Sequence, residues 1–261
     1  MRTSNRRQIL RTIGGAAALA GMRFGGRLLG QTCSILPSPA LTEGPYFVDE
    51  ILNRSDMTVD PTDNTVQAGL PLSLNINLKQ LTNCALVPLT GVYVDIWHCN
   101  AAGVYSDQAA NNTVGKKFLR AYQATDRNGA VRFQTIYPGW YGGRAVHIHA
   151  KVRIFNGPNS TYEFTTQFFF DDAITDKIYQ AAPYNTRGRR DTLNTVDGIY
   201  QGPSLLGSVS SNSGTLLMLN LDAGETSASG SIDLVVDESL GSSPSGTGDG
   251  PGGPGRPAPG N

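Results

Sequence analysis

The sequence predicts an all-β fold, an antiparallel β-sandwich with few short helices, and three observations support this prediction. Apolar residues recur at every second position in several segments, which is typical of strands with one buried face. These segments are short and are separated by turn signals rich in Gly, Pro and Asn. Only residues 172–180 have a helical pattern, and that segment is short. Many short strands with turns between them favour two antiparallel sheets packed face to face.

The individual strands follow from this alternation. In residues 72–78, leucine and isoleucine alternate with serine and asparagine. Residues 118–124 and 130–136 flank the Asp-Arg-Asn-Gly sequence at 126–129, where Asn-Gly is expected to supply the positive φ angles of a hairpin turn. By the same pattern, we expect further strands at residues 92–96, 145–154, 162–170, 216–221 and 232–236.

Along its 261 residues the chain divides into four expected parts. Residues 1–30 contain the paired arginines Arg6–Arg7 followed by a weakly apolar stretch rich in Ala and Gly, the layout of a twin-arginine-type export signal. We expect a linker at 31–40 and a single domain, by length, at 41–240. The Gly/Pro/Ser-rich tail at 241–261 is expected to be disordered. The protein is therefore predicted to be exported, to the periplasm or the cell exterior.

Composition narrows the classes of partner. The 21 basic and 21 acidic residues balance, which gives no indication of a nucleic-acid partner. No apolar run reaches the roughly 20 residues that span a bilayer. Three cysteines, Cys33, Cys84 and Cys99, permit one disulfide and one thiol, and the sequence does not choose among the three pairings. No Cys-x-x-Cys spacing indicates a cysteine zinc site.

Two of the three histidines in the chain fall close together, at His147 and His149. Residues i and i+2 of a strand project to the same face, so both imidazoles can reach one metal ion. The even-numbered positions from 146 to 154 are apolar and are expected to face a core. The histidine face is then left for chemistry, and the sequence predicts a metal site on this strand.

The other donors near these histidines are tyrosines rather than acids. Residues 129–162 contain no aspartate or glutamate, whereas Tyr137, Tyr141 and, upstream, Tyr105 are available. A phenolate is a hard anionic donor that suits ferric iron, and two phenolates with one hydroxide would neutralise Fe(III), which makes burial tolerable. A zinc hydrolase or a cupin-like Fe(II) oxygenase would need a carboxylate ligand here. The donor types favour non-haem ferric iron.

Four segments together resemble one known family. Residues 95–105 read DIWHCNAAGVY and residues 141–149 read YGGRAVHIH. The Gly-Pro-Tyr sequence within residues 42–47 and the Thr-Gln-Phe sequence at 166–168 accompany them in the same order. In this set the chain resembles the intradiol ring-cleavage dioxygenases of the protocatechuate 3,4-dioxygenase and catechol 1,2-dioxygenase type, and most of all their exported single-domain branch. The spacing from the tyrosine at 141 to the first histidine is shorter than in the protocatechuate and catechol enzymes.

The resemblance implies a site and a set of roles. One non-haem Fe(III) per chain would be bound by four ligands: Tyr105, Tyr141, His147 and His149. Tyr141 would also be the ligand that leaves when substrate binds. Arg144 would stabilise negative charge on the substrate ring, and Gln167 would hydrogen-bond around the metal ligands. Pro45, Tyr46 and Arg144 would line the substrate pocket.

The implied activity is the insertion of both atoms of O2 into a catechol-type ring, with cleavage between the hydroxylated carbons to a cis,cis-muconate-type product. Its partners would be a catechol-type substrate and O2, with no nucleic acid and no membrane span, and a homo-oligomer is compatible with the sequence. The alternative is a non-catalytic or differently metallated β-sandwich that binds aromatic ligands. Outside the site, we interpret His98 and Asp95 as structural hydrogen-bonding groups and residues 187–191 as a solvated loop.

Overall fold

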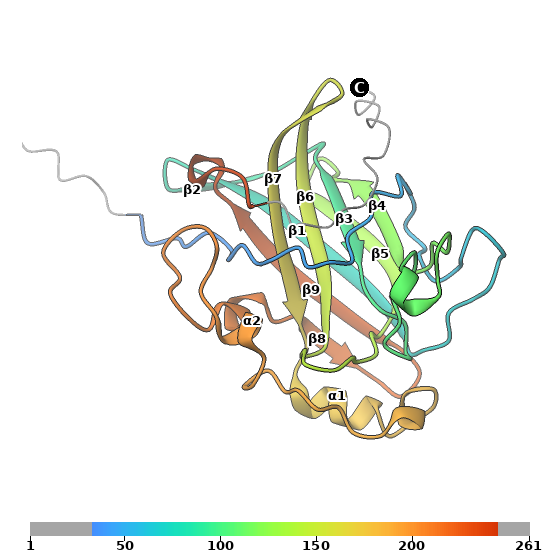
Figure 1. Ribbon diagram of the computed structural model, residues 1–261. Coiled ribbons are helices and arrows are strands. Elements are labelled where there is room, and N and C mark those ends of the chain that lie inside the picture. The colour runs from blue at the N-terminus through green and yellow to red at the C-terminus, as the bar shows by residue number, and fades with distance from the viewer. Residues whose placement is uncertain (1–32, 245–261) are drawn as a thin grey trace, which may run out of the picture. The chain divides into compact units, whose positions relative to one another are not determined.

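The computed structural model describes residues 33–244, and within them the strands form two sheets (Figure 1). One sheet has the order β4-β3-β6-β7, and the other has the order β2-β1-β9-β8, with β5 also paired to β1. The strands are β1 Pro71–Thr82, β2 Ala85–Pro88, β3 Tyr93–Trp97, β4 Arg120–Ala124, β5 Ala130–Ile136, β6 His147–Asn156, β7 Asn159–Phe169, β8 Asn220–Ala223 and β9 Ala228–Val236. The α-helices are α1 Asp172–Ile178 and α2 Gly198–Gln201, and the 3-10 helices are η1 Ala109–Asn111, η2 Tyr184–Arg187, η3 Ser213–Leu217 and η4 Glu238–Leu240. No helix in residues 33–244 is long and apolar enough to cross a membrane.

The two sheets share one hydrophobic core. On β1 the buried positions alternate with polar ones, and the buried side chains are Leu72, Leu74, Ile76 and Leu78. They belong to the same cluster as Ile96 of β3 and Ile148 of β6 in the other sheet. The sheets therefore pack face to face through their apolar sides, as the all-β sandwich prediction requires.

One pairing departs from an all-antiparallel arrangement. Strands β1 and β9 run parallel over nine residue pairs, from Leu72↔Ala228 to Gln80↔Val236. A parallel pair needs a long connection, and the rest of the domain lies between these two strands in the chain. The pairing joins the first strand in the sequence to the last.

Most predicted strands are confirmed, and β5 has the predicted bounds. The strand predicted at residues 216–221 is wrong: η3 continues through Leu217, and β8 begins only at Asn220. Leu217 is buried in the core while Leu216 is half exposed. A short apolar run fits either a helical turn or a strand, so periodicity does not separate them.

The turn between β4 and β5 was predicted in the right place but with the wrong geometry. Only Gly129 has a positive φ, of 75°, and Asn128 does not. The Asp126 carboxylate instead accepts hydrogen bonds from the backbone N–H groups of Asn128 and Ala130. The acid closes the loop, and glycine is needed at one position only.

Both ends of the described chain are built into the sandwich. The expected linker at 31–40 is in part packed: the backbone N–H of Ser38 donates to Val235 of β9, and Ala40 is fully buried. At the other end, the Ser243 hydroxyl accepts from the backbone N–H of Thr165 on β7. The predicted export signal at 1–30 and the predicted tail beyond residue 244 lie outside the described residues.

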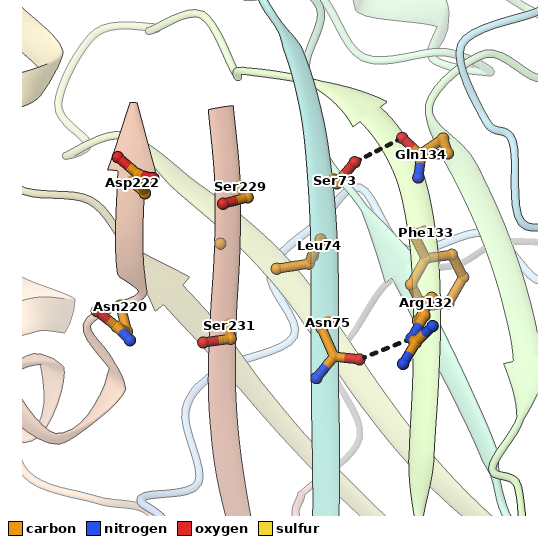
Figure 2. A pocket seen from close by; sticks show the side chains of 11 residues that line it. Ser73, Leu74, Asn75, Arg132, Phe133, Gln134, Asn220, Asp222, Ser229 and Ser231 are labelled. Atoms are coloured by element: carbon orange, nitrogen blue, oxygen red, sulfur yellow. Dashed lines mark hydrogen bonds between the residues drawn. The ribbon is translucent and has the colours of Figure 1, made fainter. Parts of the chain in front are cut away.

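The outer face of the β1-containing sheet is polar and hollowed (Figure 2). A groove of about 500 Å³ is lined by side chains of β1, β5, β8 and β9. The Ser73 hydroxyl donates to Gln134, and Arg132 donates to the Asn75 side chain across it (Figure 2). None of the predicted site residues lines this groove, so it is separate from the histidines of β6.

Candidate metal centre

Strand β6 places His147 and His149 on one face, with Ile148 turned into the core between them. Their Nε2 atoms lie 3.0 Å apart. The Tyr141 hydroxyl oxygen lies 3.1 Å from Nε2 of His147. The Tyr105 ring completes the group, 5.6 Å from the Tyr141 ring and 6.1 Å from the His149 ring between centroids. The structure thus brings together all four predicted metal ligands.

The surroundings of His147 and His149 favour the neutral form of the imidazole, which is the form that binds a metal. The backbone carbonyl of Ala145 lies 2.6 Å from Nδ1 of His147. Because a carbonyl only accepts, Nδ1 carries the proton, and the lone pair of Nε2 points toward His149 and Tyr141. Burial, reinforced by the positive charge of Arg144, lowers the pKa of His147 to about 3. Burial and the neighbouring His147 also hold the pKa of His149 well below its usual value.

The two tyrosine side chains lie in surroundings that are unfavourable for a phenol without a further partner. Tyr105 is buried, and its hydroxyl has no hydrogen-bond partner, nor does Nδ1 of His149. Burial raises the pKa of Tyr105 well above its usual value and raises the pKa of Tyr141 to about 12. An orphaned buried hydroxyl costs free energy, and a bound cation would both satisfy it and favour its ionised form.

The distances among these atoms fit a single ion. Two nitrogen ligands, each about 2.1 Å from one metal and at right angles to each other, lie about 3.0 Å apart. The two Nε2 atoms have this spacing. Within residues 33–244 no three His, Cys, Asp or Glu side chains cluster as a metal site, so the donors that join the histidines are phenols. The residues present therefore fit Fe(III) better than a carboxylate-ligated zinc or Fe(II) site.

Aromatic rings hold the ligands in place. The Trp97 ring lies flat against His149, with centroids 4.8 Å apart and planes 8° apart. The Tyr46 ring stacks on Tyr105 at 4.4 Å and meets Tyr141 edge-on at 6.0 Å. Gly44 has a φ of +71°, and a side chain there would begin 3.4 Å from His149. The Gly-Pro-Tyr segment therefore lies against the centre through Gly44 and Tyr46, while Pro45 is exposed.

Arg144 and Gln167 are in direct contact beside the centre. The Arg144 guanidinium donates to the Gln167 amide oxygen at 2.6 Å and to Asp197 at 2.9 Å. Gln167 in turn donates to the backbone carbonyl of Thr42. Arg144 lies in the loop before β6, after a turn at Gly143 with φ +81°.

Sequence reasoning missed Asp197. Its carboxylate is fully buried, accepts from Arg144 and Ala145, and caps α2 through the backbone N–H groups of Ile199 and Tyr200. Burial raises its pKa, but Arg144 and these N–H donors outweigh burial and lower it. An aspartate before a short helical stretch is a recognisable N-cap signal. Nothing in the sequence links that signal to Arg144.

Arg120 was also missed. It is 3% exposed and donates to the hydroxyl and the carbonyl of Ser106, next to Tyr105, and to the carbonyl of Tyr46. Burial lowers its pKa to about 10. This one guanidinium fixes the backbone at two aromatic residues of the site.

The interpretations of His98 and Asp95 are confirmed, and that of residues 187–191 as a solvated loop fails at Arg190. His98 is buried and bonded to the carbonyl of Cys99 and the hydroxyl of Thr135, while Asp95 accepts twice from Arg153. Arg190 is buried between two acids of α1, Asp172 and Asp176. Arg189 and Asp191 are exposed, as a solvated loop requires, whereas the acids of α1 desolvate the Arg190 side chain.

Comparison with known proteins settles the family. A family model described as "Dioxygenase" matches residues 42–197, more than half of the chain and all four predicted ligands. The solved "Intradiol ring-cleavage Dioxygenase" of Tetranychus urticae is 29% identical, with a TM-score of 0.64, covering 78% of this chain and 95% of that one. The chain belongs to the intradiol ring-cleavage dioxygenase family. This confirms the resemblance found in the sequence.

Two further members of this dioxygenase family show how the similarity extends. The dioxygenase domain of a dioxygenase and carbohydrate-binding protein fusion from Streptomyces sp. SirexAA-E is 25% identical, with a TM-score of 0.51, covering 77% of this chain and 98% of that one. A catechol 1,2-dioxygenase of Candida albicans is 31% identical over 101 residues, which are 38% of this chain. That match spans about a third, 31%, of the Candida protein. Family membership supports cleavage of a catechol-type ring.

Proposed function

We propose that this protein is a non-haem Fe(III) intradiol dioxygenase. It inserts both atoms of O2 into a catechol-type ring, cleaves the ring between the hydroxylated carbons and gives a cis,cis-muconate-type product. The observation that carries the proposal is the convergence of two neutral imidazoles and two phenols on one buried point, with no carboxylate from residues 33–244 completing the set. Family membership supports the same reaction.

Tyr105, Tyr141, His147 and His149 would hold one Fe(III) per chain. When bound, the ion supplies the Lewis acidity that ionises a catechol and the electronic coupling between the ring and O2. His147 is oriented for this by the bond from its Nδ1 to Ala145, and His149 is held by the ring of Trp97.

The two tyrosines have different roles because they differ in access. Tyr105 is 1% exposed, beneath the ring of Tyr46, and stays in place. Tyr141 is only partly buried and comes from the loop before β6. Tyr141 is therefore the phenol that would take up a catechol proton, while Tyr105 would remain a ligand.

Arg144 and Gln167 bind and orient the substrate. The guanidinium is held by Asp197 on one side and Gln167 on the other, so its charge is fixed in place before substrate arrives. A fixed positive charge beside the ring stabilises negative charge that develops on it. Pro45 and Tyr46 form the wall through which the ring enters, since Tyr46 faces Tyr141 edge-on.

We also propose that the enzyme works outside the cytoplasm. The paired arginines and apolar stretch in residues 1–30 support a twin-arginine-type export signal. A metal centre loaded in the folded state suits an export route that carries folded proteins. Fusion of residues 1–40 to a reporter tests this, with Arg6 and Arg7 both changed to Lys as the control that should retain the reporter inside the cell.

The colour of the iron-loaded protein tests the function. Charge transfer from a phenolate to Fe(III) absorbs visible light, so purified protein is expected to be burgundy and to form a muconate-type product from a panel of catechols. Tyr105→Phe should lose the visible band. Tyr137→Phe is the matched control: Tyr137 is equally buried but bonds to Thr175 away from the histidines, so its loss should leave the colour intact.

The outcomes separate the alternatives. Protein replete with iron but colourless would contradict the tyrosinate centre. Colour without ring cleavage of any catechol would favour a sandwich that binds aromatic ligands without turnover. A band that survives Tyr105→Phe and disappears in Tyr137→Phe would place the phenolate donor elsewhere.

A further inference from the structure

The three cysteines have separate environments, which the sequence could not distinguish. Cys99 is buried, donates to the carbonyl of Gly139 and has its pKa raised by burial to about 12. Cys33 and Cys84 are both exposed. The Cys33 thiol, more than burial, raises the pKa of Cys84, so the two side chains lie near each other. The two exposed thiols are therefore neighbours, and the third is kept away from oxidants.

The backbone explains how residues so far apart in sequence meet. Ser38 is anchored to Val235 of β9 by hydrogen bonds in both directions. Val235 pairs with Lys79 of β1, and β1 continues from there to the hairpin that contains Cys84. Five residues can span about 17 Å, which lets Cys33 reach the same end of the sheet from Ser38. In Figure 1 the blue start of the described chain lies at the end of the molecule that carries β2.

The turn at Cys84 adds a second observation. Thr82 pairs with Ala85, so Asn83 and Cys84 form a two-residue hairpin loop, with φ angles of 50° and 61°. Such a turn strongly favours Asn-Gly, because glycine adopts positive φ without strain. Cysteine occupies the glycine position here. Strained backbone conformations concentrate at functional positions, so the positive φ of Cys84 points to a role for its side chain.

We propose that Cys33 and Cys84 form a disulfide in the exported protein, which ties the N-terminal segment to the β1–β2 hairpin. Each thiol loses one proton and one electron, and the two electrons reduce a disulfide oxidant, such as a thiol–disulfide oxidoreductase outside the cytoplasm or oxidised glutathione in a test. Both thiols are exposed, so the bond can form after the chain has folded, which fits export of a folded protein.

The bond would restrain the N-terminal segment that leads to Tyr46, the residue whose ring stacks on the candidate ligand Tyr105. The segment that follows Cys33 bonds to β7 through Pro39 and Leu41 and then enters the Gly-Pro-Tyr stretch whose Tyr46 stacks on Tyr105. Fixing its beginning restricts the unfolded chain through a loop of about fifty residues, which stabilises the fold. Oxidation should raise the melting temperature by roughly 5–15 °C.

The test oxidises the purified full chain with oxidised glutathione and maps peptides without reduction. The expected product is a single linked pair containing Cys33 and Cys84, with Cys99 alkylated only after unfolding. The melting temperature should fall on reduction in wild type but not in Cys33→Ser or Cys84→Ser, and the double variant should match the single ones. Neither iron nor a catechol enters these measurements, so their outcome is independent of the proposed activity.

Cys84→Gly provides a control in which the change in melting temperature has opposite signs under reducing and oxidising conditions. Under reducing conditions this variant should melt at or above the reduced wild type, because glycine relieves the turn. Under oxidising conditions it should melt below wild type, by the effect of the bond less any gain from the relieved turn. Linkage through Cys99, dimers linked through Cys33, or identical melting of oxidised and reduced wild type would overturn the proposal.

Discussion

The guanidinium of Arg144 donates a 2.6 Å hydrogen bond to the side-chain oxygen of Gln167, joining the loop before β6 to the strand beyond it. Asp197 holds the other side of the same guanidinium. Arg144 is 19% exposed in its side chain, so it is fixed and yet reachable. A cation held in this way can act on a bound ring without reorganising.

Replacing Arg144 by Lys should therefore impair turnover more than folding. Lysine keeps the charge but cannot bond to Asp197 and Gln167 in one plane. We expect kcat to fall by roughly 10²–10³-fold with the iron content and the visible band retained. Steady-state kinetics on iron-loaded protein measure this, and Arg132→Lys on the outer groove is the control. Unchanged kcat in Arg144→Lys would remove Arg144 from the mechanism.

The two tyrosines should respond differently to loss of the hydroxyl. Tyr141→Phe should slow catechol binding, because the phenolate assigned to accept the proton is removed, while most of the iron is retained. Tyr105→Phe should lose iron as well as colour, because its phenol has no other partner. Stopped-flow binding and metal analysis compare the two. Wild-type binding rates in Tyr141→Phe would contradict its role as the base.

Asp197 should make stability depend on pH in acid. Burial opposes its ionisation, but Arg144 and backbone donors outweigh burial, so its pKa in the folded state is below the usual value. Its contribution is thus full at pH values above the unfolded pKa, about 4, and is lost as the pH falls through the folded pKa. The difference in unfolding free energy between wild type and Asp197→Asn should shrink as pH falls, by urea denaturation at a series of pH values. Asn keeps the Oδ1 acceptor that caps α2 but replaces the Oδ2 that accepts from Arg144 and Ala145. The charge is therefore reported by the change of this difference with pH rather than by its size at one pH. The exposed Asp222→Asn should show no comparable trend.

Arg120→Lys should destabilise the backbone at Ser106 and Tyr46, beside the candidate metal centre. An ammonium cannot reproduce the fork that bonds to Ser106 and to the carbonyl of Tyr46. Leaving buried acceptors unpaired costs about 1–3 kcal/mol each, so we expect a loss of roughly 2–4 kcal/mol in unfolding free energy. Chemical denaturation measures the loss, and hydrogen exchange of the backbone around Tyr46 reports exposure of the segment. A loss below about 0.5 kcal/mol, as for a surface substitution, would show that these bonds contribute little.

Lys151 on the histidine face of β6 lies between two carboxylates, Glu43 at 2.6 Å and Glu163 at 2.8 Å. Lys151→Met should cost about 3–5 kcal/mol, because the carboxylate of Glu43 remains buried without its cation. Adding Glu43→Gln should recover much of this loss. A double-mutant cycle measures the recovery, and strictly additive losses would show that the pair is not coupled.

The sequence could predict those parts of the fold and site that are local. Strand β6 and its two histidines follow from a period of two, because one face carries apolar side chains and the other carries polar ones, although both faces are buried over most of the strand. Residues 216–221 could not be assigned, since η3 and β8 divide an apolar run whose burial depends on distant packing. Asp197 was missed because it meets Arg144 across 53 residues of chain. Arg190 was missed for a similar reason, since its acidic partners lie on α1.

The centre is built from two kinds of scaffold. His147 and His149 belong to a strand that is hydrogen-bonded to a neighbour on each side, whereas Tyr105, Tyr141 and Tyr46 come from connecting segments. Loops accept insertions and substitutions that a central strand does not. Divergence among homologues can therefore alter which ring enters, by reshaping the segments around residues 42–50, 98–118 and 137–146, while the imidazole pair stays constant. Enzyme engineers seeking a new substrate should vary those segments and leave β6 untouched.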